Sequence, residues 1–226
     1  MENVLINFLD DYVEEPSVLL LSDLNEIEKK RLPQSWINIL SNENKKLDTI
    51  KKEWSQFKDE LSLVYEYICD NLISLDLAFF DENYHLIYGL KSTNDGEILY
   101  YQGSNPKNIL KHNDFNKMPE QLKKFYNLQN GWFYLASGTM GIMPIEETFH
   151  LNEYDWEILE NSAFDSSSIN LKNNIAIFSN GMGGHISFDE RLGELKSMTW
   201  WSEEEPTLDI DFWSVLDTWI RLGFDG

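Results

Sequence analysis

Residues 75–102 read LDLAFFDENYHLIYGLKSTNDGEILYYQ, and this stretch decides the fold class. Apolar and aromatic residues dominate 75–80, 84–90 and 98–102, which predicts three strands. The polar residues 81–83 predict the first turn, and Asn94-Asp95-Gly96 is typical of a tight turn that requires positive φ. The stretch therefore predicts an antiparallel meander.

Helices and further strands are predicted on both sides of the meander. Before it, apolar residues recur at spacings of three and four from about Thr49 to Ile73, which predicts one long amphipathic helix. A shorter helix is predicted to begin near Pro33. After the meander the pattern predicts a short helix from Pro119, strands at 132–136, 142–145, 175–178, 185–188 and 195–200, and a last helix over 209–222. Because strands and helices come in runs and do not alternate strictly, we expect an α+β fold with a mainly antiparallel sheet flanked by helices.

The composition is that of a folded protein with a large core. The chain has 226 residues, of which 42% are hydrophobic and 14% aromatic, so a disordered chain is excluded. No apolar run approaches the roughly 20 residues that cross a bilayer, and the N-terminus lacks the basic region of a secretory signal. The single cysteine, Cys69, falls on an apolar helix face, where we expect a buried, inert thiol. These features favour a cytoplasmic protein.

The charge is strongly negative and unevenly distributed. There are 39 acidic and 18 basic residues, a net of −21. From residue 143 onward the chain has 17 acidic and 4 basic residues, a net of −13, against 22 and 14, a net of −8, before it. Such a charge disfavours direct binding to nucleic acid or to an anionic membrane, and it attracts basic partners.

No catalytic residue, metal ligand or cofactor site is predicted. The four histidines lie far apart in sequence without metal-ligand spacing, and His85 is expected to be an ordinary exposed strand residue. Glycines precede His185, but the strand expected after them and the missing lysine favour a hairpin turn over a phosphate loop. Carboxylates are too numerous for an acid–base pair to be singled out. A metal-dependent hydrolase built from scattered His and Asp residues stays open as an alternative.

The densest acidic segment supplies the candidate binding residues. Trp200 and Trp201 are adjacent in a predicted strand, so one is expected in the core and the other partly exposed. An exposed Trp beside carboxylates resembles the composition of an interface hot spot, although a packed rim is the simpler explanation. Two acidic residues are also expected in the first turn of the last helix. The predicted partner-binding residues are Trp201, Glu203, Glu204, Glu205, Asp209 and Asp211, with Glu146, Glu147 and Glu153 as a second choice.

Three motifs in the second half of the chain resemble the SUKH superfamily. Residues 118–131, MPEQLKKFYNLQNG, are similar to a "Leu-Pro, helix with aromatics, Asn-Gly" unit of that family, with Met118 in place of the usual Leu. Residues 141–147, GIMPIEE, resemble the following "Gly, Leu/Met-Pro-x-Glu" element. Residues 175–189, IAIFSNGMGGHISFD, resemble a strand, a Gly turn and a strand that ends in Asp. The resemblance implies a SUKH-like core at 115–226, preceded at 1–114 by N-terminal helices and the meander, which we expect to pack on the core as one compact unit.

The resemblance implies a function in binding. SUKH proteins are mostly immunity proteins that neutralise toxins exchanged between bacteria, many of them nucleases, and others are regulatory scaffolds. We therefore expect a cytoplasmic immunity protein without enzymatic activity, whose partner is a cognate, basic protein toxin. A regulatory scaffold that binds a cellular protein is the alternative.

Overall fold

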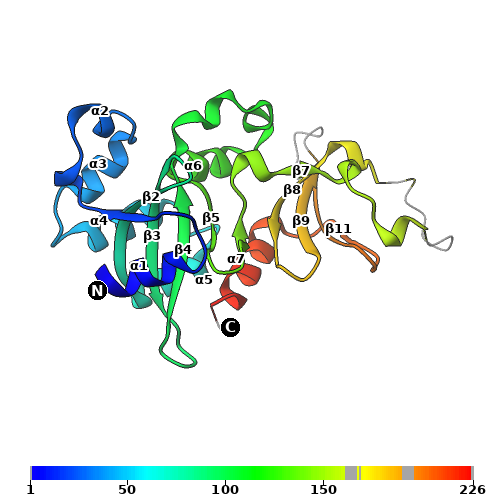
Figure 1. The fold of residues 1–226 in the computed structure, drawn as a ribbon. Helices are drawn as coiled ribbons and strands as arrows, with labels where there is room; N and C mark the ends of the chain where they lie inside the picture. Colours follow the sequence, from blue (N-terminus) through cyan, green and yellow to red (C-terminus); the bar gives the residue numbers. More distant parts are fainter. Residues whose placement is uncertain (1, 161–166, 168, 190–195, 225–226) are drawn as a thin grey trace.

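The structure is a computed structural model that describes residues 2–160, 167, 169–189 and 196–224. Within these residues eleven strands form one sheet, in which every pair is antiparallel (Figure 1). The order is β1-β2-β3-β4-β5-β6-β8-β9-β10-β11, and β7 pairs with β8 beside this path. The strands are β1 Ser17–Leu19, β2 Leu72–Phe80, β3 Asn83–Lys91, β4 Ile98–Ser104, β5 Asn130–Tyr134, β6 Thr139–Ile142, β7 Phe149–His150, β8 Asn174–Ser179, β9 Gly184–Asp189, β10 Lys196–Trp201 and β11 Thr207–Leu208.

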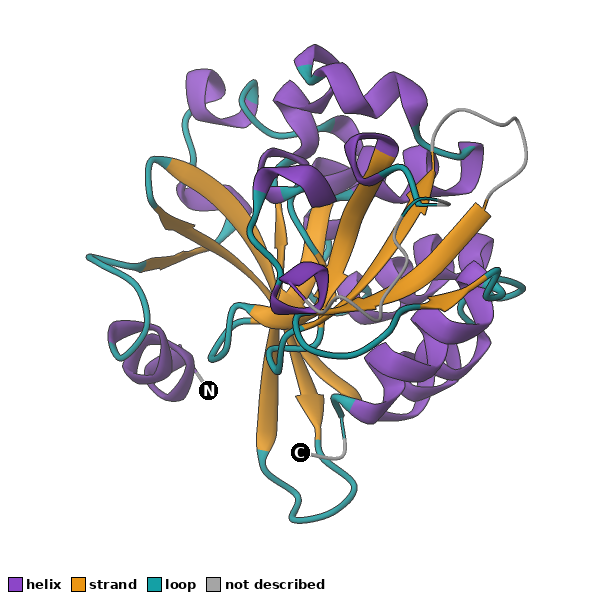
Figure 2. Cartoon of the chain, turned by 90° about the vertical axis from the view of Figure 1, so that its right-hand side faces the viewer, coloured by secondary structure: helices purple, strands orange, loops and turns teal. Residues whose placement is uncertain are grey.

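Helices flank this twisted sheet (Figure 2). The α-helices are α1 Glu2–Asp10, α2 Glu26–Lys29, α3 Gln34–Leu40, α4 Lys46–Trp54, α5 Ser62–Asn71, α6 Glu120–Leu128 and α7 Phe212–Leu222. The 3₁₀ turns are η1 Leu21–Asp23, η2 Ser55–Phe57, η3 Pro106–Lys111, η4 Asn113–Lys117, η5 Ile145–Glu147, η6 Leu151–Glu153, η7 Glu157–Glu160 and η8 Leu171–Asn173. The predicted α+β class, a mainly antiparallel sheet flanked by helices, is confirmed.

The two faces of the sheet are covered differently. Side chains of α3 to α7 pack on one face and form the main core with alternate residues of the strands. On the other face, α1 covers the meander through a small cluster that includes Leu5 and Leu9. At the far end of that same face, residues 149–158 and 169–171 pack on β8 and β10 around Trp156 and Trp200. The main core and the β4–β5 pairing both join residues before and after position 114.

The prediction of one long helix at 49–73 is wrong. The chain forms α4, the 3₁₀ turn η2 and α5, with a break at Leu61 (φ −125°, ψ 55°), and β2 already begins at Leu72. Trp54 and Phe57 before the break and Val64 and Ile68 after it are nevertheless fully buried, because each helix presents its own apolar stripe to the sheet. The carboxylate of Asp217 on α7 stabilises the new helix start by accepting hydrogen bonds from the backbone N–H groups of Leu63 and Val64 at 2.9 and 3.0 Å.

His85 is buried, so the expectation of an exposed strand residue is wrong. Its ring stacks on Phe80 with 4.0 Å between centroids, and its Nδ1 lies 3.1 Å from the Ser104 hydroxyl and 3.0 Å from Gln102 Nε2. Only 5% of the residue is exposed, because both faces of the meander are covered. Burial lowers the pKa of His85 to about 4.

Most C-terminal elements lie close to their predicted positions, although β7 and β11 were not predicted and two boundaries differ. The strand expected at 142–145 ends at Ile142, because Pro144 has no N–H for the ladder and η5 follows it. The last helix begins at Phe212, not at 209. The predicted start of the strand at 195 lies outside the described residues.

Cys69 is half-buried, not fully buried as expected. None of the helices described here has both the length and the apolar composition that a membrane span requires.

Candidate partner-binding face

The acidic residues Glu203, Glu204 and Glu205 form the exposed turn between β10 and β11. Asp209 follows β11, is exposed and has positive φ (+53°). Asp211 is the N-cap of α7, where its side chain accepts a hydrogen bond from the Ser214 N–H at 2.8 Å. The expectation that both aspartates lie in the first helical turn is therefore wrong: Asp211 caps the helix and Asp209 lies outside it.

The adjacent tryptophans point to opposite faces of the sheet, as predicted. Trp200 is fully buried, with its ring centroid 5.8 Å from that of Trp156. Trp201 is half-buried on the α7 side, where its ring lies 5.6 Å from that of Trp219 and covers Gly184. Trp201 thus packs on the helix that carries Trp219, while only part of its surface remains available beside the acidic turn.

A cluster of aromatic rings lies on the opposite side of the sheet from α7. The ring of Phe149 lies 4.6 Å from that of Tyr154, 6.3 Å from that of Trp156 and 5.3 Å from that of His185. Trp156 is fixed by a hydrogen bond from its Nε1 to the Leu151 carbonyl at 2.6 Å. The exposed fraction rises outward, from 0% for Trp200 through 8% for Trp156 to 57% for Tyr154. The cluster therefore reaches from the core to solvent, and Tyr154 is its outermost ring.

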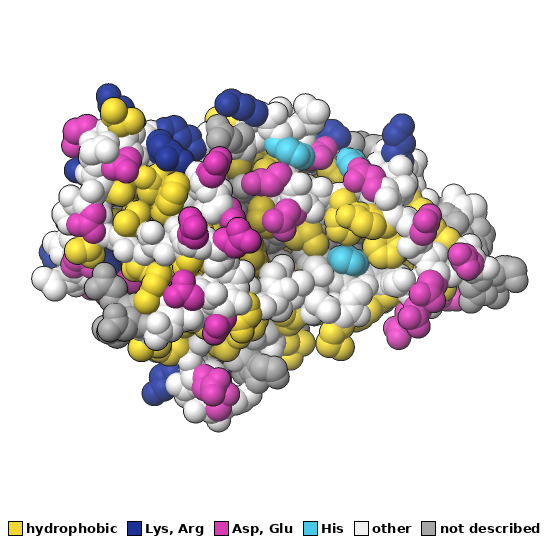
Figure 3. Space-filling view, viewed as in Figure 1, with side chains coloured by type: hydrophobic (Ala, Val, Ile, Leu, Met, Phe, Trp, Pro, Cys, Tyr) yellow, Lys and Arg dark blue, Asp and Glu magenta, His cyan; other side chains and the backbone are white. Residues whose placement is uncertain are grey.

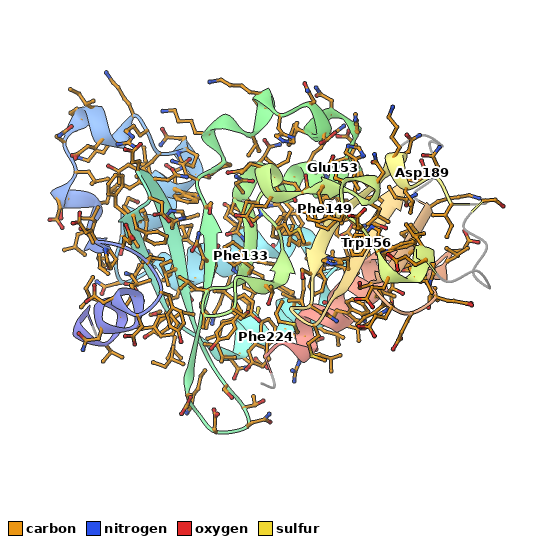
Figure 4. All side chains as sticks on the ribbon, turned by 45° about the vertical axis from the view of Figure 1, so that its right-hand side comes forward. Phe133, Phe149, Glu153, Trp156, Asp189 and Phe224 are labelled. Carbon is orange, nitrogen blue, oxygen red and sulfur yellow. The ribbon has the colours of Figure 1, made fainter. Side chains whose placement is uncertain are left out.

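Carboxylates surround this aromatic cluster. The exposed side chains of Glu153, Asp155, Glu157 and Glu160 come from the same connection. The Ile158 N–H donates to the Ser202 carbonyl at 2.7 Å, which holds η7 beside the Glu203–Glu205 turn. We define the acidic–aromatic face as Phe149, Tyr154, Trp156 and His185 together with Glu153, Asp155, Glu157, Glu160, Glu203, Glu204 and Glu205. Figure 3 shows a hydrophobic patch in the right-hand part of the molecule with carboxylates around it, and in Figure 4 Phe149, Glu153 and Trp156 lie close together beside the C-terminal strands.

The electrostatics of the acidic–aromatic face are almost purely negative. The face has seven carboxylates, and segments 143–160 and 201–211, which supply them, contain neither Lys nor Arg. Burial lowers the pKa of His185, so this ring stays neutral at pH 7 and does not offset the carboxylates. The face therefore combines an apolar centre with a negative rim.

Glu146 and Glu147 belong to the second set of partner-binding residues predicted from the sequence, and they lie in η5. The Glu146 carboxylate accepts a hydrogen bond from Asn130 Nδ2 at 2.7 Å, and it lines a hollow to which the aromatic cluster does not contribute. Partial burial raises the pKa of Glu147, and the charge of Glu146 raises it further. Of this second group, only Glu153 belongs to the acidic–aromatic face.

Two of the four histidines meet at one carboxylate, contrary to their separation in sequence. Asp114 lies 3.7 Å from His112 Nδ1, 3.6 Å from His150 Nε2 and 2.8 Å from Lys117 Nζ. Burial of Asp114 would raise the pKa of its carboxyl, but the hydrogen bond and charge of Lys117 and the two imidazoles outweigh it and lower that pKa. Across the described part of the chain, no group of three or more His, Cys, Asp or Glu side chains could hold a metal ion.

Sequence reasoning missed the aromatic half of the face. The sequence does carry one signal, because residues 149–157, FHLNEYDWE, interleave aromatic and acidic side chains within a single connection. Comparisons with protein-family models, with curated proteins and with solved structures returned no match.

Proposed function

We propose that this protein is a cytoplasmic immunity protein, without catalytic activity, that binds and neutralises a basic bacterial toxin domain through the acidic–aromatic face. The single observation that carries this proposal is the exposed ring of Tyr154, backed by Trp156 and surrounded by carboxylates. The sequence resemblance to SUKH proteins supports the same function.

The architecture of the face fits a protein partner of positive charge. Binding hot spots are typically aromatic side chains in a packed setting with a polar rim, and Tyr is enriched among them. A chain with a net charge of −21 also attracts a basic partner over a long range and speeds its association. A nuclease toxin exposes a basic cleft for its own substrate, so an acidic face could occupy that cleft.

The proposal is tested with the toxin encoded beside the gene. Co-expression should rescue bacteria from that toxin, and the purified domains should bind with a rate that falls as salt rises. Replacing Glu203, Glu204 and Glu205 by Lys should slow association by about tenfold or more at low salt. Replacing Tyr154 by Ala should leave the association rate nearly unchanged and raise the dissociation rate by about tenfold, since rings at hot spots act on complex lifetime.

The matched control places the same charge change at the other end of the chain. Asp10, Asp11 and Glu14 are exposed at and just after the end of α1, and replacing them by Lys alters the net charge equally. If this control slows association as much as the triple change at Glu203–205, only total charge matters and the face is misplaced. No rescue by any neighbouring toxin, together with capture of a host protein, would favour a regulatory scaffold.

A further inference from the structure

The hollow that Glu146 lines lies at the edge of the molecule, between segments from both halves of the chain. Its volume is about 650 Å³, and side chains from the α2–α3 connection, the β2–β3 turn, η3, β5 and η5 line it. Figure 3 shows Lys and Arg side chains gathered along the upper edge of the molecule, where Figure 1 places α2 and the segment after β4. This volume is in the range of small-molecule sites.

The lining is cationic in a protein that is otherwise acidic. Arg31, Lys107 and Lys111 carry permanent positive charges here, His112 adds an imidazole, and the carboxylates are Glu82 and Glu146. The lysine, arginine and glutamate side chains of the lining sum to a formal charge of +1, against −21 for the whole chain, and charges beyond about 8 Å are largely screened at physiological ionic strength. The groups that line the hollow therefore determine what binds in it.

Arg31 and Lys107 are held on the same wall. The Asn105 side chain donates to the Arg31 carbonyl at 2.8 Å and accepts from the Lys107 N–H at 3.1 Å. The Arg31 guanidinium donates to the Glu82 carbonyl at 2.7 Å and stands 5.1 Å from the Tyr84 ring centroid, and the Lys107 ammonium donates to the Lys30 carbonyl. These contacts use one or two of the five donors of Arg and one of the three of Lys, so further donors remain for a ligand.

Two further residues of the lining supply a polar acceptor. Asn130 is only 3% exposed; its Oδ1 accepts from the Ile145 N–H at 2.8 Å and its Nδ2 donates to Glu146 at 2.7 Å. The Glu146 carboxylate is thereby fixed, and it keeps lone pairs for a donor from a ligand. The hollow thus offers both cations and an oriented carboxylate.

We propose that this hollow binds a small phosphate monoester that also carries hydroxyl groups, such as a sugar phosphate. Arg31, Lys107 and Lys111 bind the phosphate, since guanidinium and ammonium groups form charge-assisted hydrogen bonds with phosphate oxygens. A ligand hydroxyl donates to Glu146. This site is separate from the acidic–aromatic face and does not depend on the proposed toxin binding.

Calorimetry at low ionic strength tests the site with three probes: glucose 6-phosphate, inorganic phosphate and glucose. Glucose 6-phosphate should bind saturably, inorganic phosphate more weakly, and glucose not at all. Lys107→Gln and Lys111→Gln should each weaken both phosphate probes by about tenfold, as expected for one lost charge-assisted hydrogen bond. Lys58 and Lys172 are exposed lysines outside the hollow, and Lys58→Gln and Lys172→Gln should leave both affinities unchanged.

Glu146→Gln tests the proposed hydroxyl contact separately from the proposed phosphate contact. It should strengthen inorganic phosphate binding, because a repelling charge is lost, and weaken glucose 6-phosphate relative to inorganic phosphate, because the hydroxyl acceptor is poorer. Absence of saturable binding by both phosphate probes at 10 mM, on the order of the weakest specific sites, would overturn the proposal. Equal weakening by Lys58→Gln and Lys107→Gln would also overturn it, since it would show unspecific attraction.

Discussion

Removal of the Asp217 carboxylate should destabilise the protein more than removal of any exposed helix cap. Asp217 is only 5% exposed, and its oxygens accept from the N–H groups of Leu63 and Val64 at 2.9 and 3.0 Å and from the Ser62 hydroxyl at 3.2 Å. Asp217→Ala leaves two N–H groups at the start of α5 without their acceptor. Hydrogen bonds to a charged group contribute about 1.5–3 kcal/mol each, so we expect a loss of about 3 kcal/mol in the free energy of unfolding.

Asp211→Ala is the matched control, because Asp211 caps α7 with a single bond in an exposed position. Its loss should cost about 1 kcal/mol. Urea unfolding followed by tryptophan fluorescence and by circular dichroism measures both variants, and in thermal unfolding the Asp217 variant should melt about 9 °C lower, at roughly 3 °C per kcal/mol. A loss for Asp217→Ala no larger than that for Asp211→Ala would refute the cap. Because Asp217 joins residues 1–114 to residues 115–226, two separate transitions would show that these segments unfold independently.

Two further perturbations test particular backbone and side-chain environments. Gly131 has φ +76°, and a Cβ there would lie 2.5 Å from the backbone nitrogen of Pro144, so Gly131→Ala should cost about 3 kcal/mol in urea unfolding. Gly138 has φ +66° with open space around its Cβ position, so Gly138→Ala should cost only about 1 kcal/mol. Burial lowers the pKa of His85 to about 4. As the pH falls, the unfolded protein therefore binds a proton at His85 before the folded protein does. The free energy of unfolding should therefore fall by up to about 3 kcal/mol between about pH 6.5 and about pH 4. His85→Phe should flatten this pH dependence, and an unchanged slope would show that other groups cause it.

Local patterns predicted the sheet well, and long-range contacts explain where they failed. The meander follows from alternating residues and from turn residues that act over a few positions, so its three strands lie within a few residues of the prediction. The spacing of apolar residues through 50–68 is compatible with one helix or with two. The choice depends on Asp217, which lies more than 150 residues later and caps the second helix. No local reading of the segment contains that information.

The candidate site was predictable only in part for the same reason. Net charge along the chain pointed to Glu203–Glu205, which are indeed exposed in one turn. The aromatic centre comes from a connection about 50 residues earlier, and a single backbone hydrogen bond between Ile158 and Ser202 marks where the two segments meet. Composition can therefore identify the carboxylates of the rim. The aromatic centre forms only because the fold places β8 and β10 close together in one sheet.

The motifs that resemble SUKH proteins have a structural explanation in this fold. The Asn130 side chain holds the backbone of Ile145 and the carboxylate of Glu146, and the Tyr126 hydroxyl donates to the Met143 carbonyl at 2.8 Å. Gly131 makes room for the chain at 144. These residues join two segments of backbone, so a change in any of them alters the fold before it alters a binding surface. Tyr154 and the surrounding carboxylates differ from these residues, because they are exposed and do not contribute to the core. These exposed side chains can therefore change while the fold is kept, which is why the motifs inform about architecture and not about the proposed partner.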